Sequence, residues 1–327
     1  MHKSDKKDCF NAKIYKSIAL LNTLSKILKF IIFEHLQNVV KAYDLISDIQ
    51  MKAHKHRLIN TTLQLITEKI HTVWSDIRRR VVSLLSLNEK NAFNNVTYDR
   101  LLHNMKKRRV FRLLLKFVKN FLRNQHIIIT INDYMMTKCS VNVDISQDSS
   151  LSLILYLFYN ANLLKVCNNI KLKTNFISFV NDINILTYEK FMKRNCRVLD
   201  KIYDRCKQWL KMHDIKFLKT KHKLIHFTRT FKWFNMNESL KLTEHQIDSK
   251  LNIRVLRVQL NFKLKWVIHM HHVEAKLMIK QKIMQIIIES TWDSSMMTRK
   301  QIYFAMTRSL LSHEVIIWYT SQEVKNH

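Results

Sequence analysis

Apolar residues recur at spacings of three and four along several segments of the chain, and this period is typical of amphipathic helices. Each segment is long enough to bury one face against a core. The segments with this period are 15–42, 63–87, 193–211 and 271–288. The pattern therefore predicts a helix over each of these ranges.

Two other segments carry alternating or β-branched residues around a polar centre, which is the pattern of a β-hairpin. Residues 123–143 and 176–188 each have an Asn-Asp pair at the centre, beginning at Asn132 and Asn181. Helices combined with antiparallel hairpins predict the α+β fold class. The sequence shows no internal repeat and no low-complexity linker that would indicate another architecture.

The longest apolar run, residues 151–164, is shorter than the roughly 20 residues that cross a bilayer, and Asn160 and Asn162 interrupt it. The first residues of the chain lack the apolar run of a secretory signal, and the five cysteines show no CxxC spacing. These observations predict reduced thiols, no membrane role and an intracellular location, in the cytoplasm or the nucleus.

Glycine and proline are both absent from the 327 residues, although average usage would give about 23 and 16 of them. Glycine is encoded by GGN and proline by CCN, so a process that changes G to A and C to T removes both. It turns glycine into Asp, Glu, Ser, Asn, Lys or Arg, and proline into Ser, Leu or Phe. The composition therefore indicates a decayed gene, in which each functional residue has to be checked for survival.

The formal net charge of the chain is +31, and its isoelectric point is near 10.0. This excess of positive charge favours a polyanionic partner, most simply a nucleic acid. A second interpretation stays open, because the same mutations convert Glu to Lys and Gly to Lys or Arg. Part of the charge can therefore be a product of the decay.

Histidines gather in two places, at His54 and His56 and again at His269, His271 and His272. Clustered histidines are potential zinc ligands. No cysteine pair accompanies them, and Arg codons of the type CGN decay to His under the same process. We therefore favour an origin by decay over a zinc site.

Seven segments, in consecutive order along the chain, carry its most specific sequence motifs, among them SLNEKNAF and FVNDINILTY. They are 15–37, 50–71, 86–102, 143–164, 179–188, 219–229 and 253–276. In order and spacing they resemble the reverse transcriptase domain of non-LTR (LINE-like) retrotransposons, over nearly the whole chain. The sequences of these motifs are similar to those of elements from filamentous fungi, in which a repeat-directed G-to-A mutation process is known.

The resemblance implies a right-hand polymerase fold, with helical fingers, an antiparallel palm sheet and a mostly helical thumb. It places the fingers and palm at residues 1–250 and a partial thumb and connection segment at residues 251–327. The implied reaction copies an RNA template by extending a DNA primer with dNTPs. Two Mg²⁺ ions stabilise the attacking and leaving oxygens in this family.

The family holds those ions with three aspartates, and two of the three are substituted here. Asn88 stands at the first position and Asn181 at the second, so only Asp182 remains. Mg²⁺ prefers anionic oxygen ligands, and an amide supplies no negative charge. The change from GAC to AAC is one that the decay process allows. We therefore expect a catalytically inactive copy.

Four further residues match functional positions of the family. By resemblance, Phe93 lies under the sugar of the nucleotide, and Gln147 lies near the template and the incoming base. Lys221 is the lysine of the following motif, and Arg57 is a fingers residue near the triphosphate. Two alternatives to the enzyme remain: a non-catalytic basic remnant that binds nucleic acid, and a pseudogene product without function.

Overall fold

The structure is a computed structural model of the chain, and its described residues form two compact units that alternate along the sequence. The described residues are 22–47, 49–53, 59–76, 80–123, 125–128, 130–131, 134–135, 137, 139–141, 145, 149–167, 173–213, 215–229, 238–242, 245–289, 295–308 and 310. Those of unit 1 lie within Met1–His56, Glu89–Val166 and Gln208–Phe217, and those of unit 2 within Arg57–Asn88, Cys167–Lys207 and Leu218–His327.

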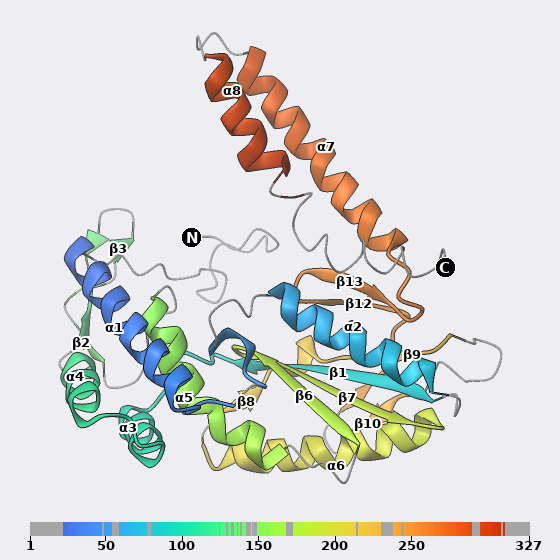
Figure 1. The fold of residues 1–327 in the computed structure, drawn as a ribbon, viewed down its shortest axis with the longest axis horizontal. Coiled ribbons are helices and arrows are strands. Elements are labelled where there is room, and N and C mark those ends of the chain that lie inside the picture. The colour runs from blue at the N-terminus through green and yellow to red at the C-terminus, as the bar shows by residue number, and fades with distance from the viewer. Residues whose placement is uncertain are drawn as a thin grey trace. The chain divides into compact units, whose positions relative to one another are not determined.

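Unit 1 is built around the apolar helix α5 (Ser150–Cys167) (Figure 1). Tyr156 and Phe158 of this helix are among the largest fully buried side chains in the described chain. A helix that is apolar on all sides belongs in a core. The buried amide of Asn104 donates to the carbonyl oxygen of Tyr159 at 3.1 Å, which ties the helix to its neighbour.

The remaining elements of unit 1 are mainly helices, with short strands that pair in twos. They are α1 (Thr23–Ala42), η2 (Met51–Ala53), α3 (Tyr98–Lys107), α4 (Arg112–Leu122), β2 (Gln125–Ile127), β3 (Thr130–Ile131), β4 (Tyr134–Met135), β5 (Cys139–Val141) and β8 (Lys216–Phe217). Strand β2 pairs with β5, and β3 pairs with β4, both antiparallel.

Unit 2 contains an antiparallel sheet with β1 (Val81–Lys90) in its middle. Along the sheet, β6 (Thr174–Phe179) pairs with β7 (Asp182–Glu189), and β7 pairs with β1. The other edge of β1 pairs with β9 (Lys223–Phe227). The last two residues of β1 belong to unit 1 and pair there with β8.

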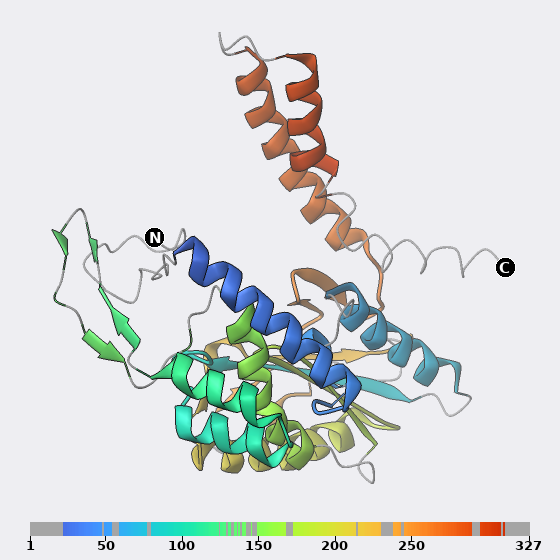
Figure 2. The ribbon, with the colours of Figure 1, turned by 60° about the vertical axis from the view of Figure 1, so that its left-hand side comes forward.

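Two helices cover the opposite faces of this sheet, α2 (Ile59–Ser75) on one side and α6 (Met192–Lys211) on the other (Figures 1 and 2). Every side chain of β1 from Val81 to Leu85 is buried as a result. A strand covered on both faces carries a nearly continuous run of buried residues and loses the alternation of a half-exposed strand.

A chain of hydrogen bonds links buried polar groups of β1 and β9 to α6. His226 Nε2 donates to the carbonyl oxygen of Glu238 at 3.0 Å, so its Nδ1 accepts from the Ser83 hydroxyl at 2.7 Å. The Asn195 amide donates to Ser83 Oγ at 2.8 Å and to the carbonyl oxygen of Val81 at 3.0 Å. Burial lowers the pKa of His226, which keeps the ring neutral. This serine–histidine pair therefore stabilises the interior, because no substrate can reach it.

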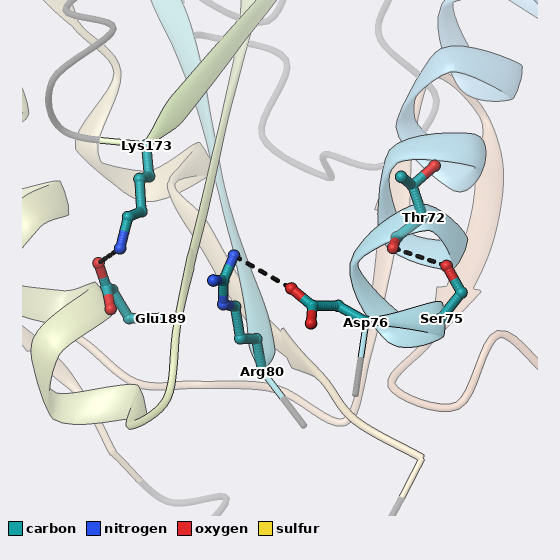
Figure 3. A network of polar contacts seen from close by, with 6 residues as sticks. All are labelled: Thr72, Ser75, Asp76, Arg80, Lys173 and Glu189. Carbon is teal, nitrogen blue, oxygen red and sulfur yellow. Dashed lines mark hydrogen bonds and ion pairs between the residues drawn. The ribbon is translucent and has the colours of Figure 1, made fainter. Parts of the chain in front are cut away.

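Surface ion pairs flank the start of β1 (Figure 3). The Arg80 guanidinium lies 3.4 Å from the Asp76 carboxylate, and Lys173 Nζ lies 3.1 Å from the Glu189 carboxylate. Pairs of this kind contribute at most about 1 kcal/mol each. Structural contacts thus occupy this end of the strand, and the candidate chemistry lies at its other end.

The rest of unit 2 consists of short strand pairs and a helical hairpin. These elements are η4 (Lys219–Lys221), β10 (Leu240–Lys241), β11 (Gln246–Ile247), β12 (Asn252–Val255), β13 (Val258–Asn261), α7 (Val267–Glu289), α8 (Met296–Tyr303) and η6 (Phe304–Arg308). Helices α7 and α8 lie side by side (Figures 1 and 2), and Lys280 Nζ donates to the carbonyl oxygen of Met306 at 2.7 Å.

The structure confirms both predicted hairpins, as β2–β5 with β3–β4 and as β6–β7, and it confirms the helices predicted at 193–211 and 271–288. The helix predicted over 63–87 is confirmed up to residue 75 and is wrong beyond it. Helix α2 ends at Ser75, and Val81 begins the central strand of the sheet. The cause is the double coverage of β1, because an apolar run buried on both faces carries no strand period.

Cys206 is disulfide-bonded, so the prediction of reduced thiols is wrong for that residue. Cys196 is free and buried, and burial raises the pKa of its thiol to about 12. Among the described helices, none is long and apolar enough to cross a bilayer. The division of the chain at residue 250 and the intracellular location stay predictions.

Candidate active site

The turn between β6 and β7 places Asp182 at the first position of β7. Phe179 pairs with Asp182, so Val180 and Asn181 form a two-residue turn. Val180 has a φ of 58°, in the left-handed region that a β-branched residue disfavours. Holding it there costs about 1–2 kcal/mol. The fold therefore maintains this turn against a local preference, as functional turns often do.

Asn88 lies directly opposite Asp182 in the register of β1 and β7. The Asn88 amide Nδ2 donates a hydrogen bond to Asp182 Oδ1. The carbonyl oxygen of Asn88 accepts from the Leu218 backbone N–H at 2.8 Å, which fixes the end of the strand. The amide and the carboxylate are thus already joined to each other.

Burial raises the pKa of Asp182, and three neighbours oppose this shift. They are the hydrogen bond from Asn88 and the positive charges of Lys221 and Lys223. Lys223 Nζ donates to the carbonyl oxygen of Arg254 at 2.6 Å, and burial lowers the pKa of its ammonium group. The candidate site therefore contains one carboxylate, one amide donor and two cations.

This set of groups does not fit two Mg²⁺ ions. A divalent pair needs several anionic oxygens, and the single carboxylate here is engaged by Asn88 and surrounded by lysines. Asn181, in the adjacent turn, contributes no charge. Within the described part of the chain, no three His, Cys, Asp or Glu side chains are grouped so as to hold a metal ion.

The fold of the chain matches solved telomerase structures. The telomerase from Candida tropicalis, in complex with a TWJ fragment of telomeric RNA, aligns over 93% of this chain and 47% of that chain, at a TM-score of 0.53 and 11% identity. Apo telomerase from the same organism, truncated from its C-terminal domain, aligns over 74% of this chain and 45% of that chain, at a TM-score of 0.49 and 10% identity. The fold is that of a reverse transcriptase-like polymerase.

At this identity the likeness concerns the fold alone. The chain spans 47% of the length of the telomerase chain that it matches. No protein-family model matches the sequence, and no curated protein matches it. The prediction of a reverse transcriptase-like fold is confirmed, and the narrower prediction of a retrotransposon family remains a proposal.

Two further predicted site residues lie in described segments, and the charge of one of them, Lys221, acts on Asp182. Phe93, in unit 1, is buried, and its ring centroid lies 4.9 Å from that of Tyr156. Lys221, in unit 2, is exposed at the end of η4. Arg57 and Gln147 lie outside the described residues.

Glu89 is a residue that sequence reasoning missed. Its side chain is 2% exposed and accepts hydrogen bonds from the Tyr156 hydroxyl and, at 2.7 Å, from the Asn160 amide. Both donors come from α5, so this carboxylate ties α5 to the strand within unit 1. The available signal was a charged residue directly after Asn88, at the end of an apolar run.

The imidazoles of His222 and His245 in unit 2 lie next to each other, and we predict that they make the stability of the fold sensitive to acid. His222 Nδ1 lies 2.9 Å from His245 Nε2, and burial, together with His245 and Lys219, lowers the pKa of His222 to about 4. An unfolded histidine titrates near 6.5, so the unfolded state binds more protons between pH 6.5 and 4, and stability falls as the pH falls through this range.

We expect His222→Gln to remove most of this dependence. The wild type should lose on the order of 2 kcal/mol more stability than the variant between pH 7 and pH 4.5. Urea unfolding at each pH measures this difference, with His271→Gln, at an exposed position of α7, as the control. Parallel pH curves for the wild type and His222→Gln would contradict the assignment.

Proposed function

We propose that the chain is the reverse transcriptase domain of a non-LTR retrotransposon of fungal type that has lost catalysis. The observation that carries the proposal is the position of Asn88 opposite Asp182, at one end of the central strand of a reverse transcriptase-like fold. The order of the sequence motifs puts two metal-binding aspartates of the family at these positions. In the intact ancestor, the β1 and β7 strands would bring both carboxylates to one place.

In this proposal the other residues keep ancestral roles. Phe93 lies under the sugar of the nucleotide, Gln147 lies near the template base, and Arg57 lies near the triphosphate. Lys221 keeps the role of the motif lysine, and its positive charge lowers the pKa of Asp182. The partners are an RNA template, a DNA primer and dNTPs, and the ancestor used two Mg²⁺ ions that the present residues cannot hold.

The backbone supports decay from a glycine-containing ancestor. Residues with a left-handed φ are normally glycine, yet here all eight such positions among the described residues carry side chains. Asp44, Arg109 and Arg257 are each one G-to-A change from a glycine codon, and Asn91 and Lys173 are two changes away. The other positions, Val180, Leu256 and Leu264, do not fit this origin.

The test combines primer extension with metal binding. The wild type should not extend a DNA primer on an RNA template with Mg²⁺ or Mn²⁺, because removing even one preorganised electrostatic group lowers a rate by about 10²–10³. Asn88→Asp combined with Asn181→Asp should gain saturable Mn²⁺ binding, measured by electron paramagnetic resonance. The lost glycines are expected to keep even this variant from full activity.

The matched control is Asn120→Asp combined with Asn252→Asp, which adds the same charge at two exposed positions. Wild-type extension within a hundredfold of an intact relative would overturn the predicted inactivity. Mn²⁺ binding by the control as strong as that of the restored pair would overturn the location of the site.

A second candidate function is a non-catalytic remnant that binds nucleic acid through its positive charge. The net charge of +31 favours it, since this charge does not depend on the lost aspartates. A pseudogene product without function is the remaining alternative. A protein that fails to unfold cooperatively on heating would support that alternative over both others.

A further inference from the structure

Helices α3 and α4 in unit 1 include a stretch that is rich in basic residues and free of acidic ones. No acidic residue occurs in the sequence between Asp99 and Asp133. Seven basic side chains of this region are exposed, and within the described residues none of them has an ion-pair partner. They are Lys106, Lys107, Arg109, Arg112, Lys116, Lys119 and Arg123. We call these seven residues the α3–α4 basic face.

Four members of the face share one side of α4. Arg112, Lys116, Lys119 and the C-cap residue Arg123 follow each other at spacings of four, three and four, which places them in one stripe. At 1.5 Å per residue the stripe is about 16 Å long. The turn between the helices then brings the end of α3, with Lys106 and Lys107, next to the start of α4 (Figure 2).

Arg108, within the same basic run, has a different role. Its guanidinium donates to the carbonyl oxygen of Leu45 at 2.7 Å and to Asn162 Oδ1 at 2.9 Å. This arginine therefore holds the fold of unit 1 together, whereas its basic neighbours face the solvent. Arg100 also serves packing, because its guanidinium lies 5.2 Å from the ring centroids of Tyr159 and Trp209. The structure thus separates these two arginines from the seven exposed cations.

The basic face is unfavourable for the isolated protein. Like charges four residues apart destabilise a helix by several tenths of a kcal/mol, and a cation in the first turn opposes the helix dipole. Helix α4 has both features, with Arg112 in a first turn that lacks any acid. By contrast, Asp200 and Asp204 are interspersed among the exposed cations of α6. A polyanion would remove the repulsion in α4.

The apolar side of α4 decides between a membrane and a nucleic acid. Val118 and Leu122 are buried, and Lys29 of α1 lies 5.1 Å from the centroid of the Phe121 ring. A membrane-surface helix needs an exposed apolar face to enter the lipid. Of the apolar residues of α4 and its N-cap, only Leu113 and Phe111 are strongly exposed, and two such side chains do not make a continuous apolar face. By contrast, about 16 Å of a DNA duplex presents about ten phosphates, at one charge per 1.7 Å.

We propose that the α3–α4 basic face binds the sugar-phosphate backbone of a nucleic acid without reading its sequence. The inference rests on the proposed function for the class of partner, but it requires neither metal ions nor catalysis. Contacts from Lys and Arg side chains to phosphates fix the position of a protein on a nucleic acid and carry no sequence information. The surface lies in unit 1, whereas the Asn88–Asp182 pair lies in unit 2.

The test replaces all four residues of the stripe, as Arg112→Gln, Lys116→Gln, Lys119→Gln and Arg123→Gln. The matched control replaces four exposed cations on α6, as Lys193→Gln, Arg197→Gln, Lys201→Gln and Arg205→Gln. Both variants lose four charges. Binding to a labelled 20-base-pair DNA duplex is measured in EDTA at several KCl concentrations. Each lost phosphate contact lowers the slope of log K against log salt by about 0.9.

We expect the stripe variant to lose about three units of slope and at least tenfold in affinity, and the α6 variant to lose less than one unit. A scrambled duplex should give the same result. Equal changes in the two variants would overturn the proposal. Retained duplex binding together with lost binding to phosphatidylserine vesicles would also overturn it, in favour of a membrane surface.

A chemical measurement on the wild type covers the case in which the stripe variant does not fold. The duplex should protect Lys116 and Lys119 from acetylation more than Lys193 and Lys201, as detected by mass spectrometry, and equal protection would refute the surface. The outcomes are separable from those of the proposed function. If the restored aspartates gain Mn²⁺ binding but the stripe variant binds DNA like the wild type, the proposed ancestry stands and the proposed nucleic-acid surface is refuted.

Discussion

Asn88→Asp should lower the free energy of unfolding by about 2–4 kcal/mol at pH 7 without divalent metal. The substitution puts a carboxylate opposite Asp182, which burial already disfavours in its charged form. Two like charges about 4 Å apart repel by about 4 kcal/mol at an effective dielectric constant near 20. The amide hydrogen bond to Asp182 is lost as well.

The pH dependence identifies the cause. Repulsion raises the pKa of the paired carboxylates in the folded variant, so the folded state binds more protons than the unfolded state. The variant should therefore match the wild type most closely at acid pH and lose stability as the pH rises through the raised pKa. Asn88→Ala is the control, because it removes the hydrogen bond and adds no charge. Its stability loss should change less with pH than that of Asn88→Asp, because it removes only the effect of the hydrogen bond on the pKa of Asp182.

A divalent metal ion should restore the lost stability of Asn88→Asp, and it should not stabilise Asn88→Ala. A divalent ion that binds only the folded state at one hundred times its dissociation constant adds about 2.7 kcal/mol. Urea unfolding with and without Mg²⁺ measures this gain, and Asn88→Ala should show none. An Asn88→Asp protein as stable as the wild type at pH 7, or equally destabilised at every pH, would contradict the assignment of this pair.

Replacing Leu256 with Asn and Arg257 with Gly should stabilise the chain by about 1–2 kcal/mol. Val255 pairs with Val258, and the two residues between them have φ values of 46° and 76°. Two positive φ values define a type I′ turn, which prefers Asn-Gly. A left-handed backbone costs a residue with a Cβ about 1–2 kcal/mol, and the added freedom of unfolded glycine offsets part of the gain.

The control for this turn is Gln259→Gly, in the neighbouring strand β13. Glycine there should destabilise the chain, since the strand backbone needs no left-handed residue. Thermal melts should show a midpoint higher by several degrees for the turn variant and lower for the control. A turn variant that melts at or below the wild type would show that the turn adapts to Leu and Arg without strain.

The sequence predicted the β6–β7 hairpin because local features encode it, with apolar runs on both sides of a polar turn that includes Asn181. It failed at β1, whose partners β7 and β9 lie about a hundred or more residues further along the chain. Strand identity there depends on coverage from both faces, which a local period does not record.

The candidate site was likewise predictable from the sequence only in part. The resemblance supplied Asn88 and Asp182, and the structure added their direct opposition and the hydrogen bond between them. The influence of Lys223 on Asp182 depends on the register of β9 beside β1, so it could not be predicted from spacing. Charge counting indicated a basic protein, and only exposure distinguished the α4 stripe from Arg108.

Each compact unit is assembled from three separate stretches of the chain, and β1 and α6 both pass from one unit into the other. No single cut of the gene therefore yields either unit with all of its parts. A fragment that ends after residue 88 would lack β7 and β9, the two strands that pair with β1. Deletion mapping of this protein would report lost folding in place of lost binding, so its surfaces can be assigned only by point substitution in the full chain.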